Sequence, residues 1–205
     1  MFNNALTVDP EHLQSLLNSA ILMQESGKPE MRPDAYARLY KVMDRQPDND
    51  RIYFNLGMLA MDDHEPAKAE NWFKTAISLR PDFRSALFNL ALLLNEQKRP
   101  LEALPFLSSL LDHFPDHVKG LILLGDIYTN YVKDLDKAEG TYKRILEIEP
   151  GHIQGRHNLC VVMVEKKDLT AAHTCLQEVM ALAPNEAYIK RHLAIVESRL
   201  KDSKS

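Results

Sequence analysis

Four asparagines recur along this chain of 205 residues, Asn18, Asn55, Asn89 and Asn158, at spacings of 37, 34 and 69 residues. Each lies among apolar residues, and a side-chain amide carries both hydrogen-bond donors and an acceptor. A spaced row of amides can hydrogen-bond the main chain of an extended peptide whatever that peptide's sequence is. The alternative is that these amides pair with neighbouring turns or with water inside the fold.

Apolar side chains accompany the asparagines at fixed offsets, one residue before and three residues after them, except that His157 precedes Asn158. If the fold turns these positions to one side, they form a mainly apolar floor, and contiguous exposed apolar surface usually marks an interaction site. The alternative is that neighbouring units bury them. The predicted peptide-binding groove consists of Asn18, Asn55, Asn89, Asn158, Phe54, Phe88, Met58, Leu92 and Ile122.

The sequence contains no nucleophile–base arrangement, glycine-rich phosphate loop or paired acidic site, so no catalytic residue is predicted. His113 and His117 are four residues apart, but Pro115 between them prevents a shared helical face. No further ligand lies at a suitable spacing. We therefore predict structural or solvated histidines, no metal site and no cofactor.

Cys160 and Cys175 are the two cysteines of the chain. They can form a disulfide in an oxidising compartment if their Cα atoms come within about 7 Å. Buried free thiols are the commoner outcome for cysteines in helical packing. Both alternatives stay open at this point.

Composition restricts the class of protein. The chain is 45% hydrophobic and 26% charged, with a net charge of −4 and a pI near 6.1, as in an ordinary folded domain. It lacks the basic face that nucleic-acid binding requires, so no nucleic-acid partner is predicted. No apolar run reaches the ~20 residues of a membrane helix, and Met1–Ala5 has no signal-peptide features. Taken alone, the chain is expected in the cytosol.

Evenly spaced prolines reveal the elements that position these residues. Pro10, Pro47, Pro81, Pro115, Pro150 and Pro184 follow one another at 37, 34, 34, 35 and 34 residues. A period near 34 residues indicates an array of helical hairpins, because proline lacks an N–H donor and disfavours helix in the residue before it. The predicted hairpins are 13–49, 50–83, 84–117, 118–152 and 153–186. Residues 1–12 are predicted to be the second helix of a preceding hairpin, and 187–205 a solvating helix with a short tail.

Within 50–83, counting Asp50 as position 1, a bulky residue, Leu-Gly, Ala, Ala, Phe, Ala and Pro lie at positions 4, 7–8, 11, 20, 24, 27 and 32. This is the tetratricopeptide (TPR) pattern. It predicts an all-α solenoid of helical hairpins wound as a right-handed superhelix. Small residues at positions 8 and 20 are expected to let the paired helices approach closely. Trp72 and Phe106, both at position 23, are interpreted as packing at the hairpin flank.

Several stretches go beyond the general pattern: Pro47–Asp63, Asp82–Leu93, Pro115–Ile127, Arg156–Val161 and Ala181–Leu193. They resemble the carboxy-terminal TPR region of the transmembrane and tetratricopeptide repeat-containing proteins, closest to the third member. The resemblance covers nearly the whole chain. It implies a luminal part of an endoplasmic reticulum enzyme that transfers mannose from dolichyl phosphate mannose to Ser/Thr of clients such as cadherins. The sugar-transfer residues of that family lie in its membrane-embedded half, which matches nothing here, so this chain alone should not catalyse the transfer.

The leading functional hypothesis is therefore a non-catalytic module that binds a protein or extended peptide client for an O-mannosyltransferase. The alternative is a free-standing cytosolic TPR scaffold for a protein complex. A carboxylate clamp of the chaperone-binding type is disfavoured, because Phe54, Met58 and Phe88 occupy positions where that clamp needs polar and basic groups. Because the chain starts in mid-hairpin, we expect it to be the carboxy-terminal piece of a longer array.

Overall fold

The computed structural model describes residues 9 and 11–202, and within that part of the chain it contains helices and no strand. The predicted all-α class is confirmed. The predicted second-helix remnant, including Phe2, Ala5 and Pro10, lies almost wholly outside the described residues.

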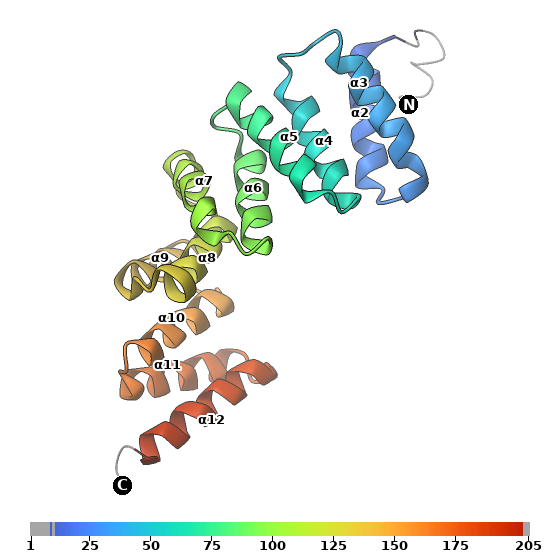
Figure 1. Ribbon diagram of the computed structural model, residues 1–205. Coiled ribbons are helices and arrows are strands. Elements are labelled where there is room, and N and C mark those ends of the chain that lie inside the picture. The colour runs from blue at the N-terminus through green and yellow to red at the C-terminus, as the bar shows by residue number, and fades with distance from the viewer. Residues whose placement is uncertain (1–8, 10, 203–205) are drawn as a thin grey trace. The chain divides into compact units, whose positions relative to one another are not determined.

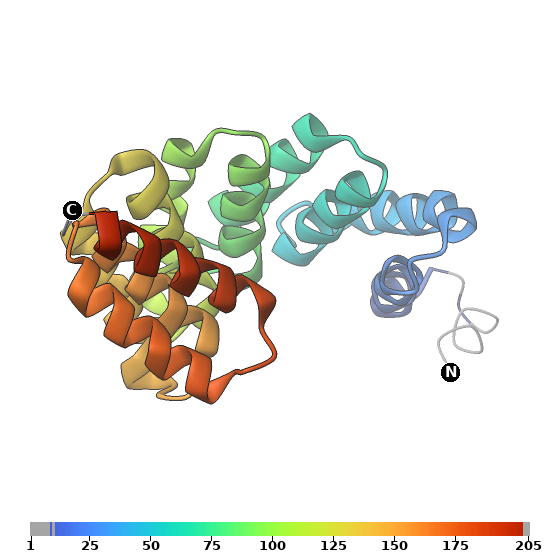
Figure 2. The same ribbon diagram turned by 90° about the horizontal axis from the view of Figure 1, so that it is seen from below.

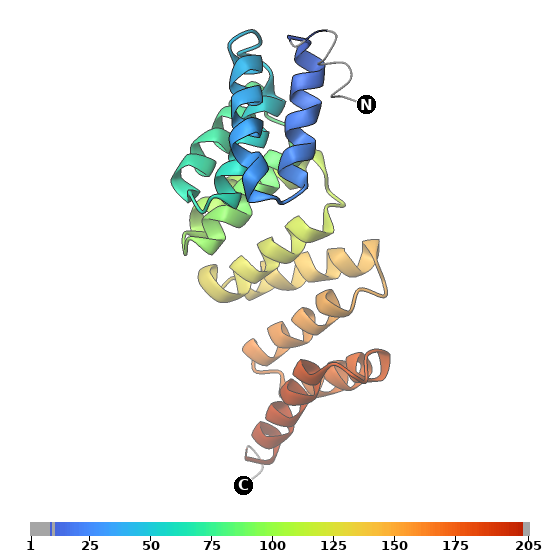
Figure 3. The same ribbon diagram turned by 90° about the vertical axis from the view of Figure 1, so that its right-hand side faces the viewer.

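The first of two compact units ends at His113 and holds three hairpins (Figures 1 and 3). Each predicted repeat from 13–49 to 84–117 contains one helix pair. The hairpins are α2 (Leu13–Glu25) with α3 (Arg32–Met43), α4 (Asp50–Asp62) with α5 (Pro66–Leu79), and α6 (Arg84–Glu96) with α7 (Pro100–His113). A short 3₁₀ turn, η1 (Pro29–Met31), takes up the surplus residues of the first repeat.

The second unit begins at Phe114 and holds two hairpins and a final helix. Its elements are α8 (Val118–Ile127), η2 (Tyr128–Val132), α9 (Leu135–Ile148), α10 (Ile153–Glu165), α11 (Leu169–Leu182) and α12 (Ala187–Asp202). In Figure 2, α12 (red) lies along α11 (orange). The extra residue predicted near Val132 is absorbed as a π-helical turn, η2, that lengthens α8.

Side-chain caps begin several of these helices. Asn49 Oδ1 accepts a hydrogen bond from the Arg51 N–H at 3.2 Å. The Nδ1 atoms of His117 and His152 accept from the N–H groups of Gly120 and Gly155 at 3.0 and 2.9 Å. Such caps satisfy N–H groups that lack a partner within the helix. His117 therefore caps the start of its helix.

Left-handed residues end the first helix of each hairpin. These are Gly27, His64, Lys98, Lys133 and Lys167, with φ between 58° and 67°. After His64, the Glu65 N–H donates to the Ala60 carbonyl at 2.8 Å, the 6→1 bond of a Schellman motif. This turn reverses the chain so that the second helix packs against the first.

Complementary volumes at positions 8 and 24 set the distance between paired helices. A Cβ atom added to Gly57 would lie 2.6 Å from Phe73 Cε1, and one added to Gly125 would lie 2.7 Å from Tyr142 Cε1. Where position 8 carries a side chain, position 24 is a leucine instead of a ring. The pairs without glycine are Ala20 with Leu39, Ala91 with Leu107, and Cys160 with Leu176.

Ion pairs join neighbouring hairpins within each unit. Arg32 Nη1 lies 2.8 Å from Asp63 Oδ1, and Arg99 Nη1 lies 2.6 Å from the largely buried Glu70 Oε2. In the second unit Lys166 Nζ contacts Asp136 Oδ1 at 2.6 Å. These contacts connect the end of one first helix to the second helix of the hairpin before it.

Cys160 and Cys175 form a disulfide that joins α10 to α11, with their Cα atoms 5.6 Å apart. The alternative of two buried free thiols, which is the commoner outcome in helical packing, is therefore wrong for this hairpin. Cys160 lies in a buried cluster with Ala172, Leu176 and Val179. The bridge thus crosses the core of the last hairpin.

We predict that Gly57→Ala destabilises the first unit by about 1–3 kcal/mol, because its new methyl group would overlap the buried Phe73 ring. Urea denaturation measures the change. Gly140→Ala is the matched control: it also lies within a helix, but nothing lies within 4 Å of the added Cβ. It should be neutral or slightly stabilising. Equal effects at both sites would contradict the volume argument.

Breaking the disulfide should lower the stability of the second unit by about 2–4 kcal/mol, since the bridge closes a loop of 15 residues. A reductant should lower the melting temperature of the native chain. It should leave the Cys160→Ala/Cys175→Ala variant unchanged. Alanine suits position 8, as Ala20 and Ala91 show. Free thiols titrated in the unreduced, denatured chain would show that the bridge is absent.

Candidate functional site

A groove of about 680 Å³ lies in the first unit, on the first helices of its hairpins. Its walls come from α2, α4 and the segment that precedes α6. It contains three of the predicted groove residues, which all lie on α4: the partly exposed Phe54 and Met58 and the buried Asn55. The lining residues are Ile21, Gln24, Glu25, Gly27, Arg51, Phe54, Asn55, Met58, Asp62, Arg80 and Phe83.

The floor of the groove is apolar and rigidly supported. The Phe54 ring is half-buried, with its centroid 5.0 Å from that of Phe83 and 5.8 Å from that of the fully buried Phe73. Ile21 and Met58 lie beside it, both partly exposed. Tilted aromatic rings at these distances attract one another. The floor is therefore already formed without a ligand.

Charged groups form the rim. Gln24 Nε2 donates to Asp62 Oδ2 at 3.0 Å. The Arg80 guanidinium lies 3.6 Å above the centre of the Phe83 ring and forms an ion pair with Asp50. In contrast, the Arg51 side chain makes no hydrogen bond or ion pair with the rest of the described chain. Its guanidinium donors are free for a ligand.

The asparagine amides are already used in part by the fold. Asn55 Nδ2 donates to the Arg51 carbonyl at 2.7 Å, and Asn89 Nδ2 to the Ser85 carbonyl at 2.8 Å. The Asn55 side chain is only 5% exposed. Each of these amides keeps its carbonyl oxygen and a second N–H hydrogen. Pairing within the array, the alternative considered from the sequence, is therefore present, and it leaves only part of each amide for a peptide.

The remaining predicted groove residues are distributed over both units. Asn18 accepts a hydrogen bond from Gln14 at 2.8 Å on α2, while Phe88, Asn89 and Leu92 lie partly exposed on α6. None of these four lines the 680 Å³ groove. The last two predicted residues, Ile122 and Asn158, belong to the second unit.

In the second unit, Asp126 joins two hairpins through hydrogen bonds. Its Oδ1 atom accepts from the Tyr142 hydroxyl at 2.6 Å and from Asn158 Nδ2 at 3.0 Å. Burial raises the pKa of the Asp126 carboxyl, and the hydrogen bond from Tyr142 opposes part of that rise. Asn158 therefore acts here as an interhairpin contact.

His157 occupies the position that is Phe54 in the second repeat, but it is 5% exposed and covered by α12. Its Nε2 atom lies 2.9 Å from His192 Nδ1, and its ring packs edge-on against Tyr188 with centroids 4.8 Å apart. Burial, followed by the charge of His192, lowers the pKa of His157; a hydrogen bond with Asn158 opposes the shift. One of these two ring nitrogens donates a hydrogen bond to the other.

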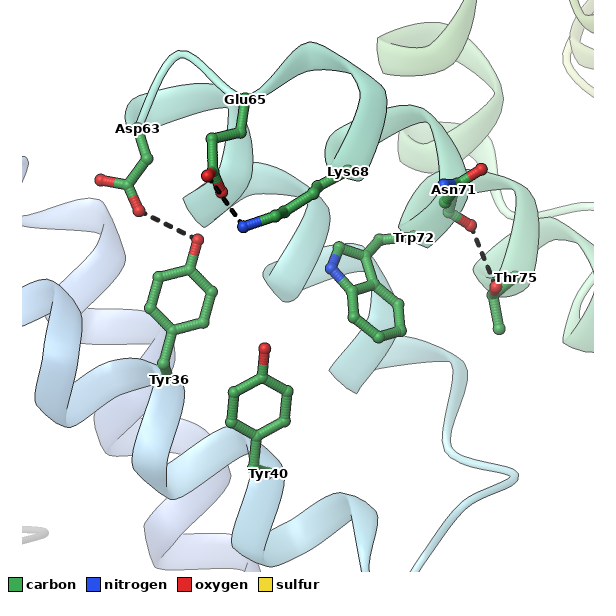
Figure 4. A pocket seen from close by; sticks show the side chains of 8 residues that line it. All are labelled: Tyr36, Tyr40, Asp63, Glu65, Lys68, Asn71, Trp72 and Thr75. Atoms are coloured by element: carbon green, nitrogen blue, oxygen red, sulfur yellow. Dashed lines mark hydrogen bonds and ion pairs between the residues drawn. The ribbon is translucent and has the colours of Figure 1, made fainter.

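A second hollow in the first unit was not predicted (Figure 4). It has a volume of about 560 Å³ and lies against α3, α5 and the turn after α4. Tyr36 and Tyr40 line it together with Trp72, which the sequence analysis assigned to packing alone. The available signal was the spacing of the two tyrosines, because residues four apart share one helical face.

Comparison with known proteins identifies what this chain is similar to. A tetratricopeptide-repeat family model matches residues 54–118. The chain is 54% identical over 202 residues to protein O-mannosyl-transferase TMTC3 of Homo sapiens, covering 98% of this chain and 22% of that protein. It is 59% identical over 174 residues to Tmtc3 of Drosophila melanogaster, covering 85% and 19%. The resemblance stated from the sequence is confirmed, and the chain spans about a fifth of the length of these relatives.

Solved structures support the same repeat architecture. YrrB, described as a TPR protein with an unusual peptide-binding site, matches with a TM-score of 0.79 at 19% identity, covering 93% of this chain and 96% of its own. MamA of Desulfovibrio magneticus RS-1 matches with a TM-score of 0.73 at 19% identity, covering 85% and 97%. The predicted TPR hairpin fold is confirmed. Among the described residues, no helix combines the length and apolarity needed to cross a membrane.

Acidification is predicted to destabilise the second unit. Because the pKa of His157 is lowered in the folded chain from its usual 6.5, the unfolded chain binds more protons as the pH falls through that value. The contribution of neutral His157 to the stability of the folded chain is thus complete above about pH 6.5 and is lost as the pH falls towards the pKa of His157 in the folded chain. Melting temperatures measured from pH 7.5 to 5.5 test this. The variant His157→Leu should flatten the pH profile, because leucine occupies the same repeat position at Leu17. The control His64→Asn replaces an exposed histidine and should leave the profile unchanged. An unchanged slope in His157→Leu would refute the assignment to His157.

Proposed function

We propose that this chain binds polypeptide clients for a protein O-mannosyl-transferase. The proposal starts from its tetratricopeptide repeats and from its homology to about a fifth of the TMTC3 protein O-mannosyl-transferases. In this proposal the chain holds an extended client segment and a part of the enzyme outside the matched region transfers mannose from dolichyl phosphate mannose to Ser/Thr. The chain itself is not assigned a catalytic residue. Client binding rests on the groove of the first unit.

The observation that carries the proposal is the pairing of a preformed apolar floor with free polar donors. Phe54 and Met58 offer side-chain pockets, and Arg51 at the rim offers guanidinium donors without an internal partner. Extended peptides are recognised by main-chain hydrogen bonds for affinity and by apolar pockets for selectivity. Asn55 also lines the groove, and its carbonyl oxygen and second N–H hydrogen can bond a main-chain amide.

The disulfide bears on the compartment in which this module works. Stable disulfides form in oxidising compartments such as the endoplasmic reticulum lumen and are rare in the cytosol. The Cys160–Cys175 bridge therefore supports a luminal module over the alternative of a free-standing cytosolic scaffold. Detecting the two cysteines as reduced thiols in protein trapped directly from cells would favour the cytosolic scaffold.

We expect Phe54→Ala to weaken binding of an extended cadherin-derived peptide by about ten- to a hundredfold, because one buried aromatic contact would be lost. Arg51→Ala should weaken it about three- to tenfold through lost hydrogen bonds. Fluorescence anisotropy with a labelled peptide measures both. Leu101→Ala is the matched control: this residue is 58% exposed on α7 and does not line the groove.

Asn55→Ala distinguishes the two roles of the asparagines. If its amide reads the client main chain, affinity should fall by about two- to tenfold for peptides of differing sequence. An unchanged affinity combined with a lower melting temperature would show that the amide serves only the fold. Unchanged affinity in Phe54→Ala and Arg51→Ala, with the helical circular dichroism signal intact, would refute the groove as the client site.

A further inference from the structure

The 560 Å³ hollow between the second helices of the first two hairpins is separate from the client groove in its lining. No residue is shared between the two sets. Its volume lies within the roughly 300–1,000 Å³ of small-ligand sites. Figure 4 shows the side chains that line it, Tyr36, Tyr40, Asp63, Glu65, Lys68, Asn71, Trp72 and Thr75.

Three aromatic rings border this hollow. Tyr36 and Tyr40 stack on α3 with their centroids 6.0 Å apart and an interplanar angle of 19°. Trp72 faces them from α5 (Figure 4), and Tyr53 packs against the indole with centroids 5.9 Å apart. The platform is therefore held by contacts within the protein, while Tyr40 remains 41% exposed.

Two polar atoms on these rings lack a partner. Neither the Tyr40 hydroxyl nor the Trp72 indole N–H hydrogen-bonds to any other residue that the structure describes. The Tyr40 ring is exposed and the Trp72 ring is partly exposed, so both groups are open to a ligand in the hollow. Together they supply two donors and one acceptor beside the aromatic faces.

The charged groups of the hollow are already balanced and oriented. Asp63 Oδ2 accepts from the Tyr36 hydroxyl at 3.0 Å, and Asp63 Oδ1 accepts from Arg32 at 2.8 Å. Lys68 Nζ donates to Glu65 Oε1 at 2.8 Å. Two carboxylates thus meet two cations, and each carboxylate has lone pairs left for further donors. A ligand gains hydrogen bonds here without bringing a net charge.

We propose that this hollow binds a neutral saccharide. The C–H groups on one side of a pyranose ring pack against the negative face of an aromatic ring, and its hydroxyls match the mixed donors and acceptors around Trp72 and Tyr40. A cationic ligand would compete with the ammonium of Lys68, which lies between Tyr36 and Trp72 in Figure 4. An anionic ligand would meet Asp63 and Glu65. The inference does not depend on the proposed client groove.

Trp72 provides a direct readout, because it is the sole tryptophan of the chain. The intact chain is titrated with mannobiose, chitobiose and maltose while its tryptophan emission is recorded. At least one disaccharide should produce a saturable change. Tyr40→Ala, which keeps Trp72, should weaken that binding about five- to a hundredfold through the loss of stacking and a hydrogen bond. Tyr131→Ala, removing a tyrosine that is 48% exposed in the second unit, is the matched control and should bind normally.

Three outcomes would overturn the inference. One is the absence of a saturable response to every sugar in the folded chain. Another is saturation by choline or a trimethyl-lysine peptide alone, which would make the hollow a cation cage. The third is loss of the sugar response in Phe54→Ala with retention in Tyr40→Ala, which would place the sugar in the client groove. Peptide binding by Tyr40→Ala, measured in parallel, should be normal, so that failure of the sugar site and failure of the client groove are distinguished.

Discussion

The fixed spacing between the two helices of each hairpin governs the rest of this structure. Position 8 of the first helix and position 24 of the second share one space, either as glycine with an aromatic ring or as a small side chain with leucine. Because protein interiors are close-packed, neither member can grow without displacing the other. In the second hairpin this spacing leaves Phe54 and Met58 of α4 partly exposed in the groove.

Residues at equivalent positions of different repeats therefore lie at the same place on their helices but make different contacts. Position 5 is a groove residue as Phe54, yet its equivalent His157 is covered by α12 and paired with His192. The asparagine position likewise serves its own helix at Asn55 and a neighbouring hairpin at Asn158. Homologous positions of a repeat array can thus line a groove in one part of its length and stabilise the fold in another.

Periodicity was sufficient to predict the fold, because proline spacing and small residues follow from helix geometry alone. It also identified Phe54, Asn55 and Met58 as neighbours, since they lie on one helix. The disulfide was left open because it depends on whether two helices bring Cys160 and Cys175 within bonding distance. The hollow beside Trp72 was missed, because it needs α3 and α5 of successive hairpins to come together, a distance that no single-repeat pattern encodes. The hydrogen bond from Asn158 to Asp126, between successive hairpins, was missed for the same reason.

The disulfide also determines how the chain responds to tension. A linear array pulled at its ends lengthens as its helices unravel, and each extended residue adds about 3.5 Å. The 15-residue separation closed by Cys160 and Cys175, whose Cα atoms stay 5.6 Å apart, cannot be drawn out in this way. A force-bearing connection through the second unit would therefore bypass the α10–α11 turn, and about 45 Å of contour length would stay hidden until the bridge is reduced.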